Sequence, residues 1–363
     1  MNKEVISDKQ GISIVTLFII GSNSIFVMGL EAKQDAWLAF ILAMIMVFPM
    51  VIIYSRIHYI FPDKDLFDIF EICFGKFIGK IMILLYTWFV FFFASDILVN
   101  YGQFIRIVNL ENTPQIVPII SLCILCAWGI KEGIEVLGRW AEFLLPIPII
   151  SFFIMILLLT PDMNMDNMKP TLAEGFKPVL EGAFSAFTFP FVQTVVFTMG
   201  FFSFKTKKSP YKIYILGLLI GGIFLCILSI INILVIGVDA ATRVYYPTRA
   251  TASKTELGNL FQGAEVMVFL TFILGGFIKI SILLLCICKG ITKVFGYKKY
   301  RFIIIPISLL VINLSYFQYD SIPYYYEFNK EVWPYYHFPF QVIFPIFIWI
   351  IAEIKNKRSI KAQ

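Results

Sequence analysis

The chain has 363 residues, of which 59% are hydrophobic and 15% are charged, and its net charge is +6. Soluble domains are about 45–50% apolar and about 25% charged, so this composition excludes an ordinary soluble globular protein. The apolar residues lie in long uninterrupted runs, which a single buried core cannot accommodate. The composition therefore predicts an integral membrane protein surrounded by the lipid bilayer.

Ten apolar runs are candidates for helices that cross a bilayer. A crossing helix needs about 20 predominantly apolar residues, and backbone groups in lipid must be paired within the segment. We therefore expect an all-α integral membrane fold with ten transmembrane helices. These are Ile12–Leu30, Trp37–Ile57, Ile78–Val99, Gln115–Ile130, Ala141–Leu159, Gly182–Phe202, Tyr211–Val238, Ala264–Lys289, Phe302–Phe317 and Phe338–Glu353.

The positions of Lys and Arg predict the orientation of the chain. With the amino terminus in the cytoplasm, most of the 30 Lys and Arg residues fall on the cytoplasmic side, in agreement with the positive-inside rule. Because the number of predicted spans is even, both termini are expected to be cytoplasmic. The positive charge is spread over several loops and does not form one compact face, so a nucleic-acid partner is not expected.

Two predicted spans are interrupted at their centres. The first contains a glycine followed by small polar residues, and the sixth contains a proline followed by a glutamine. Unwound backbone at membrane depth is tolerated only where it lines a cavity or is buried in protein, and breaks at corresponding positions of two halves indicate a transporter site. We expect one domain, 1–363, with repeats over about 12–160 and 180–354. The candidate ligand-binding residues at the breaks are Gly21, Ser22, Asn23, Phe189, Pro190 and Gln193.

Broken helices of this kind suit a small zwitterion. Freed amides after Gly21 can hold a carboxylate, and freed carbonyls around Phe189 can accept from an ammonium group, which makes an amino acid a reasonable ligand. The alternative is that Gly21 and Ser22 only pack closely against another helix. The third span adds an aromatic stripe, which is more often packing than a ligand cage. Its candidate ligand contacts are Phe89, Phe92 and Phe93.

Four ionisable residues lie in or next to spans, where charge is costly and usually functional. Lys279, in the middle of the eighth span, is expected to occupy a cation site between spans one and eight, to act as a protonation switch, or to be a structural hydrogen-bond donor. Asp96, late in the third span, is a candidate for ion or proton coupling or an interfacial residue. Arg139 and Glu142 begin the fifth span, and they either pair at a cytoplasmic gate or are helix-end charges in water.

The sequence contains no phosphate-binding loop, no cluster of metal ligands and no nucleophile–base pair. We therefore expect no cofactor, no metal and no catalytic residues, and an intramembrane enzyme is a remote alternative.

Several short motifs spread over nearly the whole chain resemble the spore germination permease family, the B subunits of nutrient germinant receptors. The resemblance implies the amino acid–polyamine–organocation superfamily and a leucine-transporter-like fold, in which two sets of five helices form an inverted repeat with helices 1 and 6 broken. The motifs are Gln10-Gly11-Ile12-Ser13-Ile14, Asp35-Ala36-Trp37, Phe61-Pro62 with Gly75-Lys76, Thr113-Pro114, Gly133-Ile134-Glu135 with Arg139 and Glu142, and Lys169-Pro170.

The resemblance also implies a location and partners. The family resides in the spore inner membrane and assembles with germinant receptor A and C subunits. One departure concerns the ligand, because Gln193 stands where the family usually carries an acidic residue, which argues against a cationic ligand there. We expect a nutrient-sensing subunit that binds a small molecule, such as an amino acid, near the bilayer midplane and triggers germination. The alternative is a proton-coupled amino acid transporter.

Overall fold

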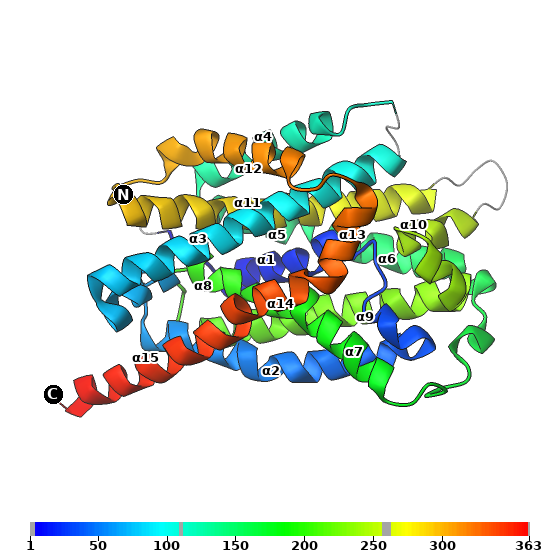
Figure 1. The fold of residues 1–363 in the computed structure, drawn as a ribbon, viewed down its shortest axis with the longest axis horizontal. Helices are drawn as coiled ribbons and strands as arrows, with labels where there is room; N and C mark the ends of the chain where they lie inside the picture. The colour runs from blue at the N-terminus through cyan, green and yellow to red at the C-terminus, as the bar shows by residue number, and fades with distance from the viewer. Residues whose placement is uncertain (1–3, 109–111, 256–262, 362–363) are drawn as a thin grey trace.

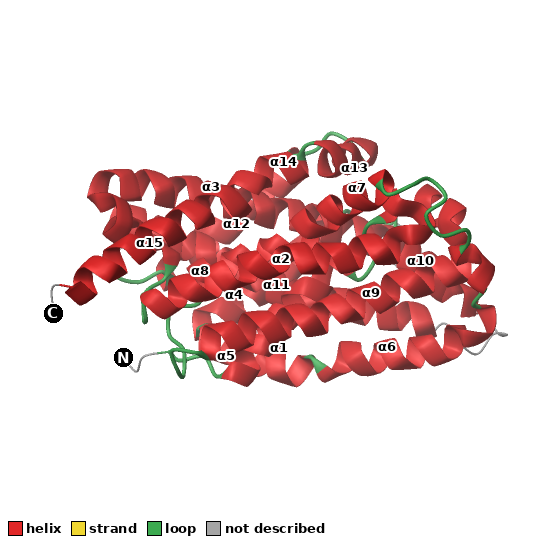
Figure 2. Ribbon diagram, turned by 90° about the horizontal axis from the view of Figure 1, so that it is seen from below, coloured by secondary structure: helices red, strands yellow, loops and turns green. Residues whose placement is uncertain are grey.

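The computed structural model describes residues 4–108, 112–255 and 263–361. Within these residues the regular elements are helices, which run roughly along one axis of an elongated bundle, and both termini lie at the same end (Figures 1 and 2). We call this end the terminal end and the opposite one the far end. An even number of membrane crossings requires this placement of the termini.

The order of helices follows the predicted spans, with extra elements between them. The π-helical and 3-10 segments (η) occur at breaks and connections. The bounds are α1 Asp8–Ile20, η1 Gly21–Asn23, η2 Leu30–Asp35, α2 Ala36–Ile60, α3 Leu66–Val108, α4 Ile116–Glu132, α5 Ile134–Leu144, α6 Pro146–Leu159, η3 Thr160–Asp162, η4 Met165–Met168, α7 Lys177–Ala186, η5 Phe187–Phe191, η6 Val192–Val196, α8 Phe197–Gly200, α9 Ser209–Arg243, α10 Pro247–Ala252, η7 Ser253–Thr255, α11 Gly263–Phe295, η8 Arg301–Ile303, α12 Ile304–Phe317, α13 Ile322–Glu331, α14 Trp333–Phe338, η9 Pro339–Ile343 and α15 Phe344–Lys361.

In the part of the chain that the structure describes, seven helical stretches are long and apolar enough to cross a membrane. The number is eight if the bent pair Arg301–Phe317 and Ile322–Glu331, with a 102° bend, is one span. Two expected spans fail this test: the first, where α1 has 13 residues before its break, and the fourth, where α4 has 17 residues. The ninth expected span passes only as part of the bent pair. The protein is thus an all-α membrane protein with seven to eight candidate spans by length, and the expected number of ten is not established by this test.

The helix α1 occupies the centre of the bundle. It packs against α9, α11 and α5, and most of its side chains are fully buried. Small residues allow the close approach, since Gly217 and Gly221 of α9 face Val15 and Ile19 of α1. Packing through small residues is the usual way for helices to associate in lipid. The break at the end of α1 is therefore held in the interior of the protein.

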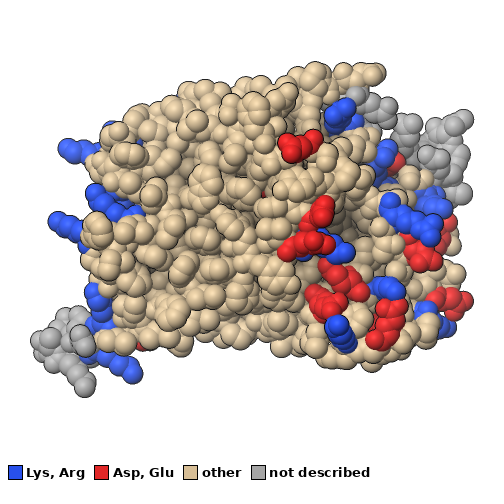
Figure 3. Space-filling view, in the orientation of Figure 1, with Lys and Arg blue, Asp and Glu red and all other residues tan. Residues whose placement is uncertain are grey.

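Charged side chains are segregated along the bundle. On the face shown in Figure 3 the terminal end carries Lys and Arg almost alone, the far end carries both signs, and the belt between them has few charges. A belt of this kind is expected of the part that lies in the hydrocarbon core. The excess of positive charge at the terminal end is what the positive-inside rule gives for a cytoplasmic terminal end, and this orientation stays a prediction.

Candidate ligand-binding site

The first break lies where the sequence predicts it. The helix α1 ends at Ile20, and a short 3-10 turn and irregular chain follow until η2. The side-chain amide of Asn23 donates to the carbonyl oxygen of Ile19 at 2.5 Å, and the hydroxyl of Ser24 donates to the carbonyl oxygen of Gly21 at 3.1 Å. Side chains thus satisfy carbonyl groups that lose helical partners at a break.

The second break is at the predicted proline. The helix α7 ends at Ala186, and the wide turn η5 follows, in which Phe189 has an extended backbone with φ −143° and ψ 107° directly before Pro190. The hydroxyl of Thr188 donates to the carbonyl oxygen of Phe184 at 3.1 Å. Proline cannot continue the helical hydrogen-bond pattern, so the chain changes direction here.

Lys279 of α11 joins the two breaks. Its ammonium group donates to the hydroxyl of Ser22 at 2.8 Å and to the side-chain oxygen of Gln193 at 2.9 Å. The side chain of Lys279 is fully buried. Three residues that the sequence singled out separately, on the first, sixth and eighth predicted spans, therefore meet at one point. Lys279 forms structural hydrogen bonds, which was one of the expected alternatives, and it does so inside the candidate site.

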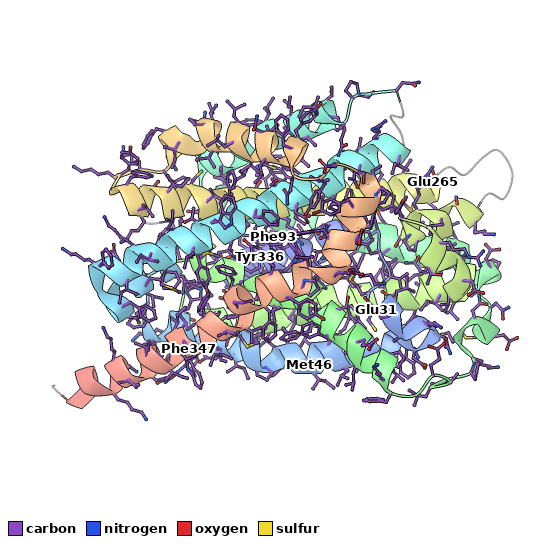
Figure 4. All side chains as sticks on the ribbon, viewed as in Figure 1. Glu31, Met46, Phe93, Glu265, Tyr336 and Phe347 are labelled. Carbon is purple, nitrogen blue, oxygen red and sulfur yellow. The ribbon has the colours of Figure 1, made fainter. Side chains whose placement is uncertain are left out.

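Aromatic rings surround the Lys279 ammonium. Its nitrogen lies 4.8 Å from the ring centroid of Phe18, and 5.3 Å from those of Phe93 and Phe189. At these distances the negative face of a ring attracts a cation. Figure 4 places Phe93 near the middle of the bundle. We call Lys279, Ser22, Gln193 and these three rings the central cluster.

Only one of the three expected phenylalanines of α3 belongs to the central cluster. Phe93 does, whereas Phe89 stacks on Phe340 at a centroid distance of 4.9 Å and Phe92 stacks on Trp333 at 6.0 Å. Both partners belong to the carboxy-terminal elements η9 and α14. Phe89 and Phe92 therefore pack between helices in this structure, which is the alternative expected of an aromatic stripe.

Asp96 connects α3 to α13. Its carboxylate accepts hydrogen bonds from the hydroxyl of Tyr319 at 2.7 Å and from the side-chain amide of Asn329 at 3.1 Å, and the residue is 2% exposed. Asp96 is thus a buried residue of the bundle and not one exposed at the interface with water. Its proposed part in ion or proton coupling stays a prediction.

The expected pairing of Arg139 with Glu142 differs from the structure. The guanidinium of Arg139 lies 2.7 Å from the carboxylate of Glu135, one turn earlier in α5, and the side chains of this pair are 65% and 40% exposed. Residues three and four apart are neighbours on a helix, so both Glu135 and Glu142 are within the reach of Arg139, and the structure pairs it with Glu135. Glu142 is also exposed. The assignment of Arg139 and Glu142 to a gate stays a prediction.

A cavity of about 570 Å³ lies beside the second break. Its walls include Thr188 and Phe189 of η5, Glu31 of η2, and Asn329 and Lys330 of α13. Charged side chains of both signs surround a hollow on this side of the molecule (Figure 3), and Glu31 lies nearer the far end than Phe93 does (Figure 4). The cavity is large enough for a small molecule.

Phe189 belongs to both the cavity and the central cluster. Phe189 is one of the residues that line the cavity, and the centroid of its ring lies 5.3 Å from the Lys279 ammonium. Of the residues in the central cluster, Phe189 alone is part of the cavity wall. Phe189 is thus the residue at which the central cluster borders the open space.

A second lysine of α11 ties several elements together at the terminal end. The Lys289 ammonium donates to the carbonyl oxygen of Gly200 at 2.9 Å, lies 3.6 Å from the carboxylate of Asp65, and lies 4.3 Å from the ring centroid of Phe202. A cation at the carboxy terminus of α8 suits the free carbonyls there. These contacts hold the end of the broken sixth span against α11.

Phe18 and Lys289 were missed by the sequence reasoning. Phe18 precedes Ser22 by four residues, so a helical wheel extended backwards from the break would have placed both on one face. No sequence signal indicated the contacts of Lys289. A lysine at the end of a predicted span helps to predict the orientation of the chain, but it does not show whether its side chain points into the bundle.

Comparisons with known proteins identify the family. A model of the family described as spore germination protein matches residues 5–321. Spore germination protein KB of Bacillus subtilis (strain 168) is 27% identical over 367 residues, covering 100% of this chain and 98% of that protein. Spore germination protein XB of Bacillus anthracis is 22% identical, covering 95% of this chain and 98% of that protein.

Two solved structures have the same fold. MHP1, a nucleobase-cation-symport-1 family transporter with bromovinylhydantoin bound, matches with a TM-score of 0.68 at 12% identity, covering 90% of this chain and 75% of that one. MhsT in complex with L-phenylalanine matches with a TM-score of 0.64 at 13% identity, covering 97% and 89%. The fold is thus leucine-transporter-like, as expected, and both family and fold are those of permease-like membrane proteins and not of enzymes. The resemblance seen in the sequence is confirmed: the chain belongs to the spore germination protein family.

Proposed function

We propose that this protein is the nutrient-sensing membrane subunit of a spore germinant receptor. A small molecule, most simply an amino acid, binds between the two broken helices near the middle of the bilayer and favours one arrangement of the helices over another. A ligand shifts a conformational equilibrium only by its difference in affinity for the two states. The shift then passes to partner subunits and starts germination.

The observation that carries the proposal is the meeting of both breaks at Lys279. Its ammonium bonds to Ser22 and Gln193, and the cavity reaches Phe189, whose ring lies 5.3 Å from this ammonium. Unwound backbone in a membrane needs such a cavity or a buried setting. The proposed ligand site comprises Gly21, Ser22, Asn23, Phe93, Phe189, Pro190, Gln193 and Lys279.

The proposed architecture is one domain of ten spans, with repeats over about 12–160 and 180–354 related by inversion. The two further spans in this count are the broken first span, which begins with α1, and α4, both of which are too short to pass the length test. In this arrangement the ligand site lies between the first members of the two repeats, which is common among transporters built from inverted repeats.

The proposed setting is the spore inner membrane, with both termini in the cytoplasm and with germinant receptor A and C subunits as partners. Family membership and the location of both termini at one end support it. The partners are needed because a sensor without transport must pass its conformational change to another protein.

Spores that carry Ser22→Ala test the proposal. Loss of a hydrogen bond to a charged group is worth about 1.5–3 kcal/mol, so half-maximal germination should require about tenfold more nutrient or more. Ser121→Ala is the matched control, because Ser121 is exposed on α4 and its hydroxyl bonds only to its own helix. Equal responses of the two variants, at equal protein levels by immunoblot, would contradict the proposed site.

A proton-coupled amino acid transporter is the second candidate. The likeness to transporters and the cavity beside the site favour it. Purified protein in liposomes separates the two candidates, because a transporter accumulates labelled amino acid in response to a pH gradient, whereas a sensor binds the same compound without uptake.

A further inference from the structure

Within the described part of the chain, the cation at the centre of the protein has no carboxylate in direct contact. The charge of Asp96 acts on it from a distance, and that carboxylate is hydrogen-bonded to Tyr319 and Asn329. The Lys279 ammonium has two hydrogen-bond acceptors, the Ser22 hydroxyl and the Gln193 amide oxygen, and both are neutral. Among the residues that the structure describes, none contributes a carboxylate within ion-pair distance of it. A buried charge is costly unless it is paired, so this site favours the arrival of an anion.

Unused hydrogen-bond donors lie at the same point. An ammonium group has three N–H donors and no acceptor, so one donor remains after Ser22 and Gln193. Because Lys279 can only donate, the Gln193 atom that faces it must be the oxygen, which fixes the orientation of the amide. The other amide atom, Nε2 of Gln193, is buried and has no partner. Buried donors without partners are rare and require an explanation.

We propose that the ligand carries a carboxylate, which binds between the Lys279 ammonium and Nε2 of Gln193. The proposal rests on the ligand site proposed above and assigns the chemical class of its ligand. The two oxygens of a carboxylate can accept from both donors at once, which neutralises the buried cation and satisfies the amide. Neutral sugars and simple amines lack this group and gain nothing from the cation.

The route to this position runs past Phe189. Phe189 lines the cavity, and the ammonium lies 5.3 Å from the centroid of its ring. The backbone of Phe189 is extended and lies outside the helical ladder. The ring can therefore move aside without the loss of a regular helix, and a carboxylate then reaches Lys279 from the cavity.

The test uses pairs of compounds that differ only in the acidic group. L-alanine, L-leucine and L-phenylalanine, each with its amide, are titrated against the full-length protein in nanodiscs by calorimetry. At least one acid should bind more tightly than its amide by about tenfold or more. Lys279→Met should remove this preference and Lys279→Arg should retain part of it. Lys33→Met is the matched control, because Lys33 lines the cavity but lies outside the central cluster.

A second variant keeps the test valid if Lys279→Met fails to fold. Gln193→Glu supplies a carboxylate within the protein at the position of the amide, so it should lower the affinity for acids and leave the protein folded. Equal binding of acids and amides by the wild type overturns the proposal. So does an acid preference that survives in Lys279→Met or, where that variant does not fold, in Gln193→Glu.

The same titration distinguishes failure of this inference from failure of the proposed function. Glucose is included as an uncharged nutrient. If glucose binds and no acid does, the ligand does not carry a carboxylate, and the proposed nutrient-sensing function still stands. Binding of none of the compounds overturns both.

Discussion

Gly21 packs backbone to backbone against Gly275 of α11. A Cβ atom on Gly21 would lie 2.8 Å from the carbonyl carbon of Gly275, closer than real Cβ atoms approach. Gly21 is therefore part of a close-packed contact, which was the alternative to a ligand-binding role. The neighbouring Ser22 contacts Lys279 instead. The close packing of Gly21 and the hydrogen bond of Ser22 thus lie on adjacent residues of the same break, and the part of Gly21 in the ligand site stays a prediction.

The first prediction concerns this contact. Gly21→Val should destabilise the protein by about 1–3 kcal/mol, because an extra side chain in a packed core forces the backbone apart. A lower melting temperature of the detergent-purified protein is the measurement. Gly200→Ala is the control, since its Cβ would lie 3.5 Å from the sulfur of Cys286, an ordinary contact. A stable Gly21→Val protein that only loses its nutrient response would show that the contact is not the reason for the glycine.

The second prediction concerns Phe189 as the barrier between the cavity and Lys279. The experiment introduces Ser22→Cys into a protein without its six native cysteines and measures how fast the new thiol reacts with a small charged thiol reagent. Adding Phe189→Ala should increase this reaction rate. Phe70→Ala is the control, because Phe70 packs on Tyr86 at a centroid distance of 5.0 Å and neither residue lines the cavity. An unchanged reaction rate in Phe189→Ala would place the barrier elsewhere.

The third prediction concerns the carboxylate of Asp65, which precedes α3 at the terminal end. Burial raises the pKa of Asp65 above its ordinary value of 3.8, and the positive charge of Lys289 opposes this shift. The folded state therefore holds the proton more tightly than the unfolded chain. The contribution of Asp65 to stability is full below pH 3.8 and falls as the pH rises through its folded pKa.

Lys289→Met removes the opposing charge and raises the pKa of Asp65 further. The destabilisation by Lys289→Met should therefore be larger at pH 7 than at pH 5, as measured by melting temperature, and Asp65→Asn in the same chain should abolish this difference. Arg139→Met is the control with little effect at either pH, because exposed pairs contribute about 0–1 kcal/mol. If Lys289→Met lowers the melting temperature equally at pH 5 and at pH 7, Lys289 does not act through the carboxylate of Asp65.

The fourth prediction concerns the attachment of α13. Tyr319→Phe removes one donor to the buried carboxylate of Asp96 and should destabilise the protein by about 1.5–3 kcal/mol. Tyr316→Phe is the control, because Tyr316 is 64% exposed. Proteolysis should cut Tyr319→Phe faster between α12 and α13. Equal stability of the two variants would mean that Asn329 alone holds Asp96.

The sequence predicted the breaks because their causes are local. A proline, and a glycine next to small polar residues, weaken a helix wherever they occur. Family, fold class and most helix positions followed from apolar runs and short motifs in the same way. Lys279 was singled out as a cation site, a protonation switch or a structural hydrogen-bond donor, because a charge at that depth is costly and usually functional.

The partners of these residues were not predictable, because they depend on how each helix rotates about its axis. Phe93 faces Lys279 while Phe89 and Phe92, on the same helix, face η9 and α14. Arg139 selected Glu135 over Glu142 by a difference of one residue in helical spacing. The cavity is built from segments far apart in the chain, and no single stretch of sequence encodes it.

Lys279 fastens together residues that are 257 and 86 positions away in the chain. A single side chain thus couples the ends of two discontinuous helices to a continuous one. A bound molecule that replaces the hydrogen bond of Lys279 to Ser22 or to Gln193 changes the geometry of the other bond as well. Binding therefore moves the helices relative to one another, and the bound molecule itself is not chemically changed. Such a junction can report the presence of a molecule without consuming or releasing it.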